Sequence, residues 1–234
     1  MEASLRNKID LIKNVYTAIK ESAENSGRDV TQVRLVAVSK TKPVEDILQF
    51  RRAGIREFGE NYVQEFIEKY EALADQDILW HFVGTLQSNK VKYIIDKVYM
   101  IHTVDSVSLA AEIQKQAEKK NVHKVKVLIQ VNVGNEPQKG GVNPEDLVEI
   151  YNEINKFDRI SIRGLMSIPP FLEAEELRPF HRKLFDLRDM ILKESSADPS
   201  EFRELSMGMS ADFDVAIEEG ATIVRIGSIL FGER

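Results

Sequence analysis

Hydrophobic runs and amphipathic stretches alternate along most of the chain. Residues 3–25 predict one amphipathic helix, because apolar side chains recur there at spacings of three and four: Leu5, Ile9, Ile12, Tyr16 and Ile19. From residue 33 onward, short apolar runs are typical of strands covered on both faces, as in parallel sheets. The pattern predicts eight such strands, at residues 33–40, 55–60, 78–84, 98–104, 124–133, 160–168, 202–208 and 222–228.

Helical periodicity fills the intervals between these strands. It predicts seven further helices, near residues 43–53, 61–74, 89–96, 106–120, 143–156, 173–195 and 211–219. Local signals mark some of the helix ends. Pro43 suits a first helical position, Ser210 suits an N-cap, and Gly220 suits a left-handed helix terminus.

Eight strands, each but the last followed by a helix, predict a (β/α)8 TIM barrel of the α/β class. Such barrels take about 250 residues. The 234 residues therefore predict a single domain, with an extra amino-terminal helix in residues 1–26 and the barrel in residues 33–234. The alternative is an open doubly wound sheet, which would follow if the weakest strand, at residues 55–60, were a loop.

Composition excludes several kinds of site. The chain has no cysteine, which rules out disulfides, thiolate metal sites and a cysteine nucleophile. The four histidines lack metal-ligand spacing, so no metal centre is predicted: His81, His102, His123 and His181. A net charge of −6, with only short basic clusters beside acidic runs, argues against nucleic-acid binding.

The amino-terminal residues carry charges through every turn, which predicts neither a signal peptide nor an anchor. No hydrophobic stretch approaches the roughly 20 residues that a membrane helix needs. The expected location is the cytoplasm.

Small and polar residues gather where the predicted strands end, which is where a barrel has its active site. The last two strands end in "SMGMS" and "RIGSILFG", where Gly208, Gly227 and Ser228 offer main-chain N–H groups and a hydroxyl. Barrels commonly bind phosphate in these two loops. In the structural alternative, the glycines turn corners and Ser210 caps a helix. Two such loops at the two expected strand ends favour phosphate binding.

Arg225 lies within the apolar run "TIVRIGS", where a buried guanidinium needs hydrogen-bond acceptors. Two kinds of acceptor would serve. One is a structural carboxylate of the protein, and the other is a ring nitrogen or a carboxylate of a bound ligand.

Lys40 ends the apolar run "RLVAVSK", on the strand that barrel closure places beside the last one. A lysine near apolar groups and a cation loses its proton more easily, and its amine can then form a Schiff base with a carbonyl. Lys42 has the same strand parity, although Pro43 indicates a turn there and favours Lys40. A lysine, phosphate loops and an arginine are together what pyridoxal 5′-phosphate (PLP) requires.

Six segments resemble the pyridoxal-phosphate homeostasis proteins, the YggS/PROSC family: "VAVSKTKP", "FGENYVQE", "WHFVGTLQSNK", "GLMSIPP", "LSMGMSADF" and "VRIGSILFG". They follow the family's order, from the first strand to the last residues. The resemblance implies the fold type III barrel found in the amino-terminal domain of alanine racemase, with PLP as the cofactor.

The resemblance also implies roles for single residues. Lys40 matches the family's Schiff-base lysine, and Arg225 matches the arginine facing the pyridine nitrogen. Lys139 lies where some members carry a second lysine suspected of handling PLP, with a solvated loop lysine as the alternative. The remaining residues assigned to PLP by position are the phosphate-segment residues and two pocket residues: Ser206, Gly208, Gly227, Ser228, Asn61 and Met166.

A carrier of PLP is expected rather than an enzyme. An arginine beside the pyridine nitrogen disfavours its protonation, which makes the ring a poorer electron sink. Racemases of this fold add a tyrosine from a carboxyl-terminal β-domain, which is not expected here because the sequence stops at Arg234. The predicted function is PLP homeostasis by a monomer that holds PLP on Lys40 and buffers it or delivers it to PLP-dependent apoenzymes. The alternatives are a PLP-dependent amino-acid racemase or lyase, a lysine-dependent aldolase and a phosphate-sugar binder.

Overall fold

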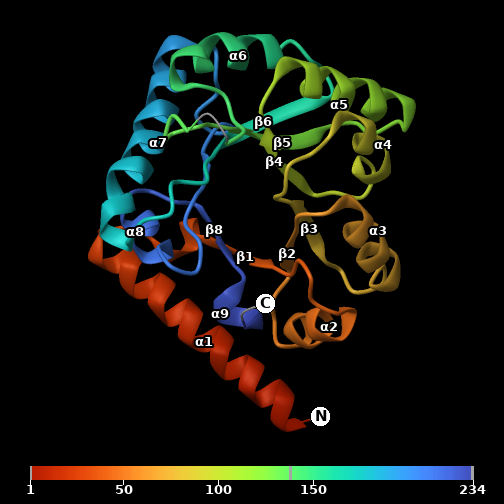
Figure 1. Ribbon diagram of the computed structural model, residues 1–234, viewed down its shortest axis with the longest axis vertical. Helices are drawn as coiled ribbons and strands as arrows, with labels where there is room; N and C mark the ends of the chain where they lie inside the picture. The colour runs from red at the N-terminus through yellow and green to blue at the C-terminus, as the bar shows by residue number, and fades with distance from the viewer. Residues whose placement is uncertain (1, 137–138, 233–234) are drawn as a thin grey trace.

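The computed structural model describes residues 2–136 and 139–232. Eight parallel strands pair in chain order, and β1 pairs with β8, which closes the sheet into a barrel (Figure 1). The predicted (β/α)8 barrel is confirmed, and the open sheet is wrong because β2 pairs with strands on both sides. The strands are β1 (Arg34–Val38), β2 (Glu57–Glu60), β3 (Leu79–Phe82), β4 (Met100–Val104), β5 (Val125–Gln130), β6 (Ile160–Met166), β7 (Glu204–Ser206) and β8 (Ile223–Ile226).

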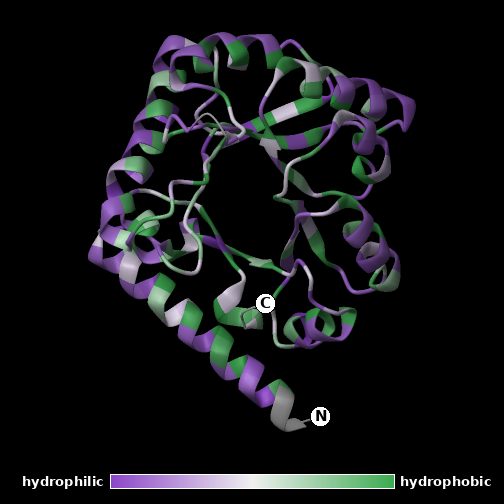
Figure 2. Cartoon of the chain, viewed as in Figure 1, coloured by the Kyte–Doolittle hydropathy of each residue, from purple (hydrophilic) through white to green (hydrophobic). Residues whose placement is uncertain are grey.

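Helices surround the barrel and present both hydrophilic and hydrophobic residues along their length (Figure 2). The helices are α1 (Glu2–Asn25), α2 (Val44–Arg52), α3 (Val63–Ala72), α4 (Val91–Ile94), α5 (Val107–Lys119), α6 (Leu147–Ile154), α7 (Ala174–Glu194), α8 (Phe213–Glu218) and α9 (Ser228–Phe231). Short 3-10 turns precede β1, α4 and α6: Val30–Gln32, Ser88–Lys90 and Pro144–Asp146. Among the described residues, no helix combines the length and the apolar character that crossing a bilayer requires.

The predicted amino-terminal helix lies outside the barrel, where α1 packs against α2 and α8 (Figure 1). Arg28, just after α1, fixes this end by donating hydrogen bonds to the carbonyls of Ile217 and Ala221. The expectation of an extra helix beside a barrel is therefore confirmed.

Two predicted helix starts are wrong, one by one residue and the other by two. Pro43 is the N-cap of α2 rather than its first residue, and Asp212, not Ser210, is the N-cap of α8. The Asp212 carboxylate accepts a hydrogen bond from the Met209 amide and contacts His181, so the chain between Ser210 and α8 forms a turn. Gly220 ends α8 in the left-handed region, as predicted.

Hydrophobic side chains fill two regions. The larger lies between the strands and the helices and includes Phe50, Phe58 and Phe66. The smaller cluster contains one residue from each of five strands: Val36, Met100, Leu128, Met166 and Ile223. Alternate residues of a barrel strand point inward, so this second cluster fills part of the barrel interior.

Candidate functional site

A cavity of about 430 Å³ opens at the carboxyl ends of the strands. Its lining comes from the loops after β1, β2, β3, β6, β7 and β8. The cavity brings together five residues that the sequence assigned to PLP: Lys40, Asn61, Arg225, Gly227 and Ser228. It lies at the end of the barrel where the sequence predicted the chemistry.

The main chain on both sides of Lys40 is held by a buried ion-pair cluster. The Lys69 ammonium, with a side chain only 5% exposed, donates to the Ser39 carbonyl at 2.7 Å and to the Glu60 carboxylate at 2.8 Å. Lys69 also binds Glu65, whose carboxylate accepts a hydrogen bond from the Thr41 amide. Ser39 and Thr41 are thus both fixed, which sets the direction in which Lys40 leaves the backbone.

Thr41 adds a constraint of its own, because its φ of 64° lies in the left-handed region. The chain turns here, and the Lys42 amide donates to the Ser39 carbonyl at 3.1 Å. Since β1 ends at Val38, the strand parity that Lys40 and Lys42 seemed to share does not exist. Both lysines nevertheless line the cavity, so the assignment of Lys40 rather than Lys42 as the Schiff-base lysine stays a prediction.

Asn61 follows β2 and is positioned by close contact with Gly84. A Cβ atom on Gly84 would lie 2.1 Å from the Asn61 carbonyl oxygen, so only glycine allows this approach. The Asn61 side-chain oxygen is buried without a hydrogen-bond partner among the described residues. It is a vacant acceptor at the cavity, which a ligand hydroxyl can satisfy.

The guanidinium of Arg225 is held by a hydroxyl and a carbonyl rather than by a carboxylate. It donates to the Ser206 hydroxyl at 2.7 Å and to the Ser167 carbonyl at 2.8 Å. No carboxylate of the described residues lies within ion-pair distance, although the charge of Asp212 acts on Arg225. Burial lowers the pKa of Arg225 to about 10, so at neutral pH the group remains a cation facing the cavity.

A row of polar side chains runs from Arg225 through the barrel interior. The Ser206 hydroxyl lies 2.9 Å from His102 Nδ1, His102 Nε2 lies 2.8 Å from His81 Nδ1, and His81 Nε2 makes a bent contact of 3.0 Å with Glu57. Arginine can only donate, so Ser206 accepts there and has one proton left to donate to His102. Both imidazoles then carry their proton on Nε2, and every group in the row has a consistent role.

Neither histidine was assigned a role from the sequence. Burial lowers the pKa of both imidazoles, and the neighbouring cation Arg225 contributes to the low pKa of His102. The neutral forms fit the proton assignment above. This row fixes Arg225 in place beneath the cavity.

These histidines predict a loss of stability in mild acid. Their pKa values in the folded state lie below the usual 6.5. Below about pH 6.5, both histidines are therefore protonated in the unfolded chain while they stay neutral in the folded chain. The stability present above this pH should fall by up to about 1.4 kcal/mol per pH unit for each histidine. Urea unfolding between pH 8 and pH 5 measures the slope.

Two variants serve as controls. His102→Gln, which keeps polar atoms in the row, should flatten the slope, whereas replacement of the exposed His123 should leave it unchanged. A wild-type stability that is constant or rises on acidification would contradict neutral buried imidazoles.

The turn after β8 presents main-chain N–H groups beside the cavity. The amides of Gly227 and Ile229 both donate to the Ser210 hydroxyl, at 3.3 and 3.5 Å. These hydrogen bonds are long and therefore weak, so both N–H groups remain available to donate to an anion. Ser210 was read from the sequence as a helix cap, but it lies in the loop after β7 and accepts these bonds from the turn after β8. The convergence of the β7 and β8 loops was the signal that could have identified it.

Three residues assigned to PLP do not line the cavity. Met166 is packed in the barrel interior, and Ser206 is buried between Arg225 and His102. Gly208 approaches α8 so closely that a Cβ atom would lie 2.6 Å from that of Ala216, and its φ is 86°. Their contacts with PLP stay predictions. Two of them support a residue that does reach the cavity, because the Ser206 hydroxyl and the Gly208 carbonyl both accept hydrogen bonds from Arg225.

Lys139 lies apart from the cavity. Its ammonium pairs with Glu136 at 2.6 Å and donates to the Pro169 carbonyl at 2.9 Å. Neither contact brings it to the lining that Lys40 shares with Lys42.

Comparisons with known proteins agree with this geometry. Residues 13–234 match the family model for the alanine racemase N-terminal domain. A protein of Aquifex aeolicus named pyridoxal phosphate homeostasis protein is 50% identical over 97% of this chain and 99% of its own length.

Solved structures match as well. A protein from Bifidobacterium adolescentis has a TM-score of 0.92 at 34% identity, covering 99% of this chain and 97% of its own. PipY of Synechococcus elongatus, solved with PLP bound, has a TM-score of 0.80 at 35% identity, covering 92% of this chain and 100% of its own. The chain therefore belongs to the alanine racemase N-terminal domain family and, within it, to the group of the pyridoxal phosphate homeostasis proteins.

Proposed function

We propose that this protein binds PLP in the cavity at the carboxyl ends of the strands and acts in PLP homeostasis. The observation that supports it most is the meeting of three unlike groups at one cavity: the Lys40 amine, the Arg225 cation and the amides around Gly227. The relatives named above point the same way, since one bears that name and another was solved with PLP bound.

The residues present fit the cofactor. Lys40 would hold the aldehyde covalently, and the amides of Gly227 and Ile229, with the hydroxyls of Ser210 and Ser228, would hold the phosphate. When bound, PLP supplies an aldehyde that condenses with amines and a ring that can draw electrons. The vacant acceptor of Asn61 suits a hydroxyl on that ring.

Arg225 favours storage of the cofactor over catalysis. Its guanidinium offers only donors, and Ser206 and Ser167 hold it in place. A fixed cation opposite a ring nitrogen disfavours a proton on that nitrogen and weakens the ring as an electron sink. A protein built this way holds PLP and shields its aldehyde without driving carbanion chemistry.

Borohydride reduction and a panel of L-amino acids test this proposal. The purified protein incubated with PLP should be yellow and yield a reduced covalent adduct, and no L-amino acid should be converted faster than by free PLP. Conversion above that rate would favour the racemase or lyase. A colourless protein trapped only with a carbonyl substrate would favour the aldolase, and no adduct under any condition would favour a phosphate-sugar binder.

Three finer statements belong to the same proposal. Residues 1–234 form one PLP-binding domain, the protein works as a monomer in the cytoplasm, and PLP-dependent apoenzymes receive the cofactor from it. An exposed Ser228 and the half-buried Lys40 support transfer, because an incoming amine can reach this end of the barrel.

A further inference from the structure

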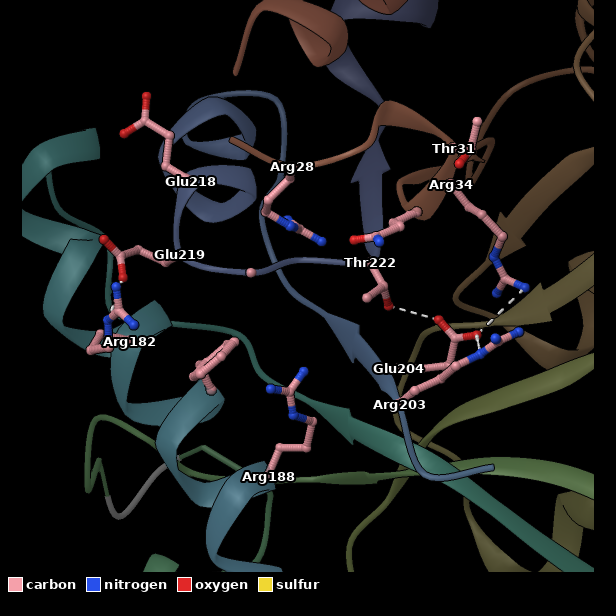
Figure 3. Close-up of a pocket in the computed structure, with 13 residues that line it drawn as sticks. Arg28, Thr31, Arg34, Arg182, Arg188, Arg203, Glu204, Glu218, Glu219 and Thr222 are labelled. Atoms are coloured by element: carbon pink, nitrogen blue, oxygen red, sulfur yellow. Dashed lines mark hydrogen bonds and ion pairs between the residues drawn. The ribbon is translucent and has the colours of Figure 1, made fainter. Parts of the chain in front are cut away.

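A second and larger cavity, of about 640 Å³, lies at the opposite end of the barrel. Arg34 begins β1, Glu204 begins β7 and Thr222 precedes β8, so this cavity opens at the amino ends of the strands. Among the described residues, five arginines and three glutamates line it, from the segment after α1, from α7, from the end of α8 and from the strand starts (Figure 3). We call it the arginine pocket; its charged lining residues are Arg28, Arg34, Arg182, Arg188, Arg203, Glu204, Glu218 and Glu219.

Two of the three glutamates are already paired at one side. Glu219 pairs with Arg182 at 2.6 Å, and Glu218 with Arg178, which does not line the pocket, at 2.8 Å. In Figure 3 the Glu218 carboxylate points away from the central space. Neither carboxylate is left to neutralise the arginines across the pocket.

Arg28 and Arg188 point toward the same space (Figure 3). Arg28 donates only to two main-chain carbonyls, and no carboxylate of the described residues lies within ion-pair distance of it. Arg188 donates to the carboxylate of its neighbour Asp189 from Nε at 3.1 Å and from Nη2 at 2.8 Å, and it lies over the Phe185 ring at 4.2 Å. Burial lowers the pKa of Arg28, and the repulsive charge of Arg188 lowers it further, as expected for two close cations with incomplete neutralisation.

Arg34, on the opposite wall, is also incompletely satisfied. Its Nε and Nη2 atoms are buried without a hydrogen-bond partner among the described residues. Its nearest carboxylates, Glu57 and Glu204, lie 3.7 and 3.9 Å away, beyond hydrogen-bond distance. Glu204 is held by the Thr222 hydroxyl, and Arg203 also stays 3.9 Å from it. Arg34 therefore adds an incompletely neutralised cation to this wall.

We propose that the arginine pocket is a binding site for a small phosphate anion with at least two negative charges, either pyrophosphate or a phosphate monoester, held chiefly by Arg28 and Arg188. A guanidinium offers a planar pair of donors that matches two phosphate oxygens. Two facing cations, of which only Arg188 has a carboxylate partner among the described residues, fit such an anion, which offsets their repulsion. No lysine of the described residues lines this pocket, so an aldehyde would not be captured by them, and the site differs in chemistry from the cavity of Lys40.

Calorimetric titration of the PLP-loaded, borohydride-reduced protein tests the site. Reduction keeps the phosphate group of PLP at the other end of the barrel, so added pyrophosphate or glycerol phosphate reports on a second site. We expect saturable binding at low ionic strength. Arg28→Gln and Arg188→Gln should each weaken it by at least about tenfold, whereas Arg52→Gln, at an exposed arginine outside the pocket, should not change it.

Arg28 also holds the segment after α1 against the carbonyls of Ile217 and Ala221. Arg28→Gln can therefore destabilise the fold, and weaker binding by this variant alone would not prove a direct contact with the anion. Arg188→Gln avoids this, because its described partners are Asp189 and the Phe185 ring, and an unchanged melting temperature establishes that it folds. Absence of saturable binding up to about 1 mM, or equal affinity in Arg188→Gln, would overturn the site. Malonate binding as tightly as pyrophosphate would overturn the assignment to phosphate.

Discussion

Replacing Lys69 with methionine is expected to destabilise the protein by about 3 kcal/mol, because it leaves a buried carboxylate without its cation. Glu60 has no exposed side-chain surface and accepts from Lys69 at 2.8 Å and from the Ser39 hydroxyl at 2.6 Å. Lys69 also fixes Ser39 and, through Glu65, Thr41. The same variant should therefore weaken PLP binding by loosening the segment that carries Lys40.

The dependence of this effect on pH separates charge from packing. Burial raises the pKa of Glu60, and Lys69 opposes the rise, so removing Lys69 raises the pKa further. A carboxyl whose folded pKa is raised loses stability as pH increases above its unfolded value, near 4.5. The deficit of Lys69→Met in urea unfolding should therefore be larger at pH 8 than at pH 5. Adding Glu60→Gln should recover most of it, and a deficit that stays constant with pH would assign the effect to packing.

Lys40→Ala is expected to abolish the borohydride-reducible adduct and to weaken PLP binding by at least about a hundredfold, or about 3 kcal/mol. The phosphate-binding amides around Gly227 and the Arg225 cation remain in this variant, so weak reversible binding should persist. The adduct is followed by intact mass and the affinity by the quenching of Trp80, which is buried.

Lys42→Ala is the matched control, because Lys42 lines the same cavity two residues further along the turn. It should keep the adduct and most of the affinity. If Lys40→Ala kept a full adduct and Lys42→Ala lost it, Lys42 would be the residue that binds PLP covalently, and the proposed function would be unchanged. Absence of an adduct from both variants and from the wild type would exclude covalent binding of PLP.

The fold could be predicted because barrel strands are short apolar runs buried on both faces. β2 (Glu57–Glu60) was the weakest prediction, and the structure gives the reason. Glu57 contacts His81 and is only 18% exposed, and Glu60 is fully buried and pairs with Lys69, so both charges of β2 point into the fold. A strand that carries charged residues does not show the expected hydrophobic pattern, even when those residues have buried partners elsewhere in the chain, so the pattern alone predicts it poorly.

The candidate site could be predicted only where the chain interrupts an apolar run. Lys40 and Arg225 were found in this way, and both line the cavity. The cluster around Lys69 and the contact of His81 with His102 join residues 30 and 21 positions apart, and only barrel closure places them together. Ser210 was misassigned because a serine before a helix is a good local cap signal, whereas the neighbouring loop after β8 decides its role.

Peptide mapping of the PLP-incubated, borohydride-reduced protein tests the central claim most directly. We predict one modified peptide, with the label on Lys40, at a stoichiometry near one per chain. A label on Lys42 or Lys139, labels spread over many lysines, or no label at all would contradict Lys40 as the residue that holds the cofactor.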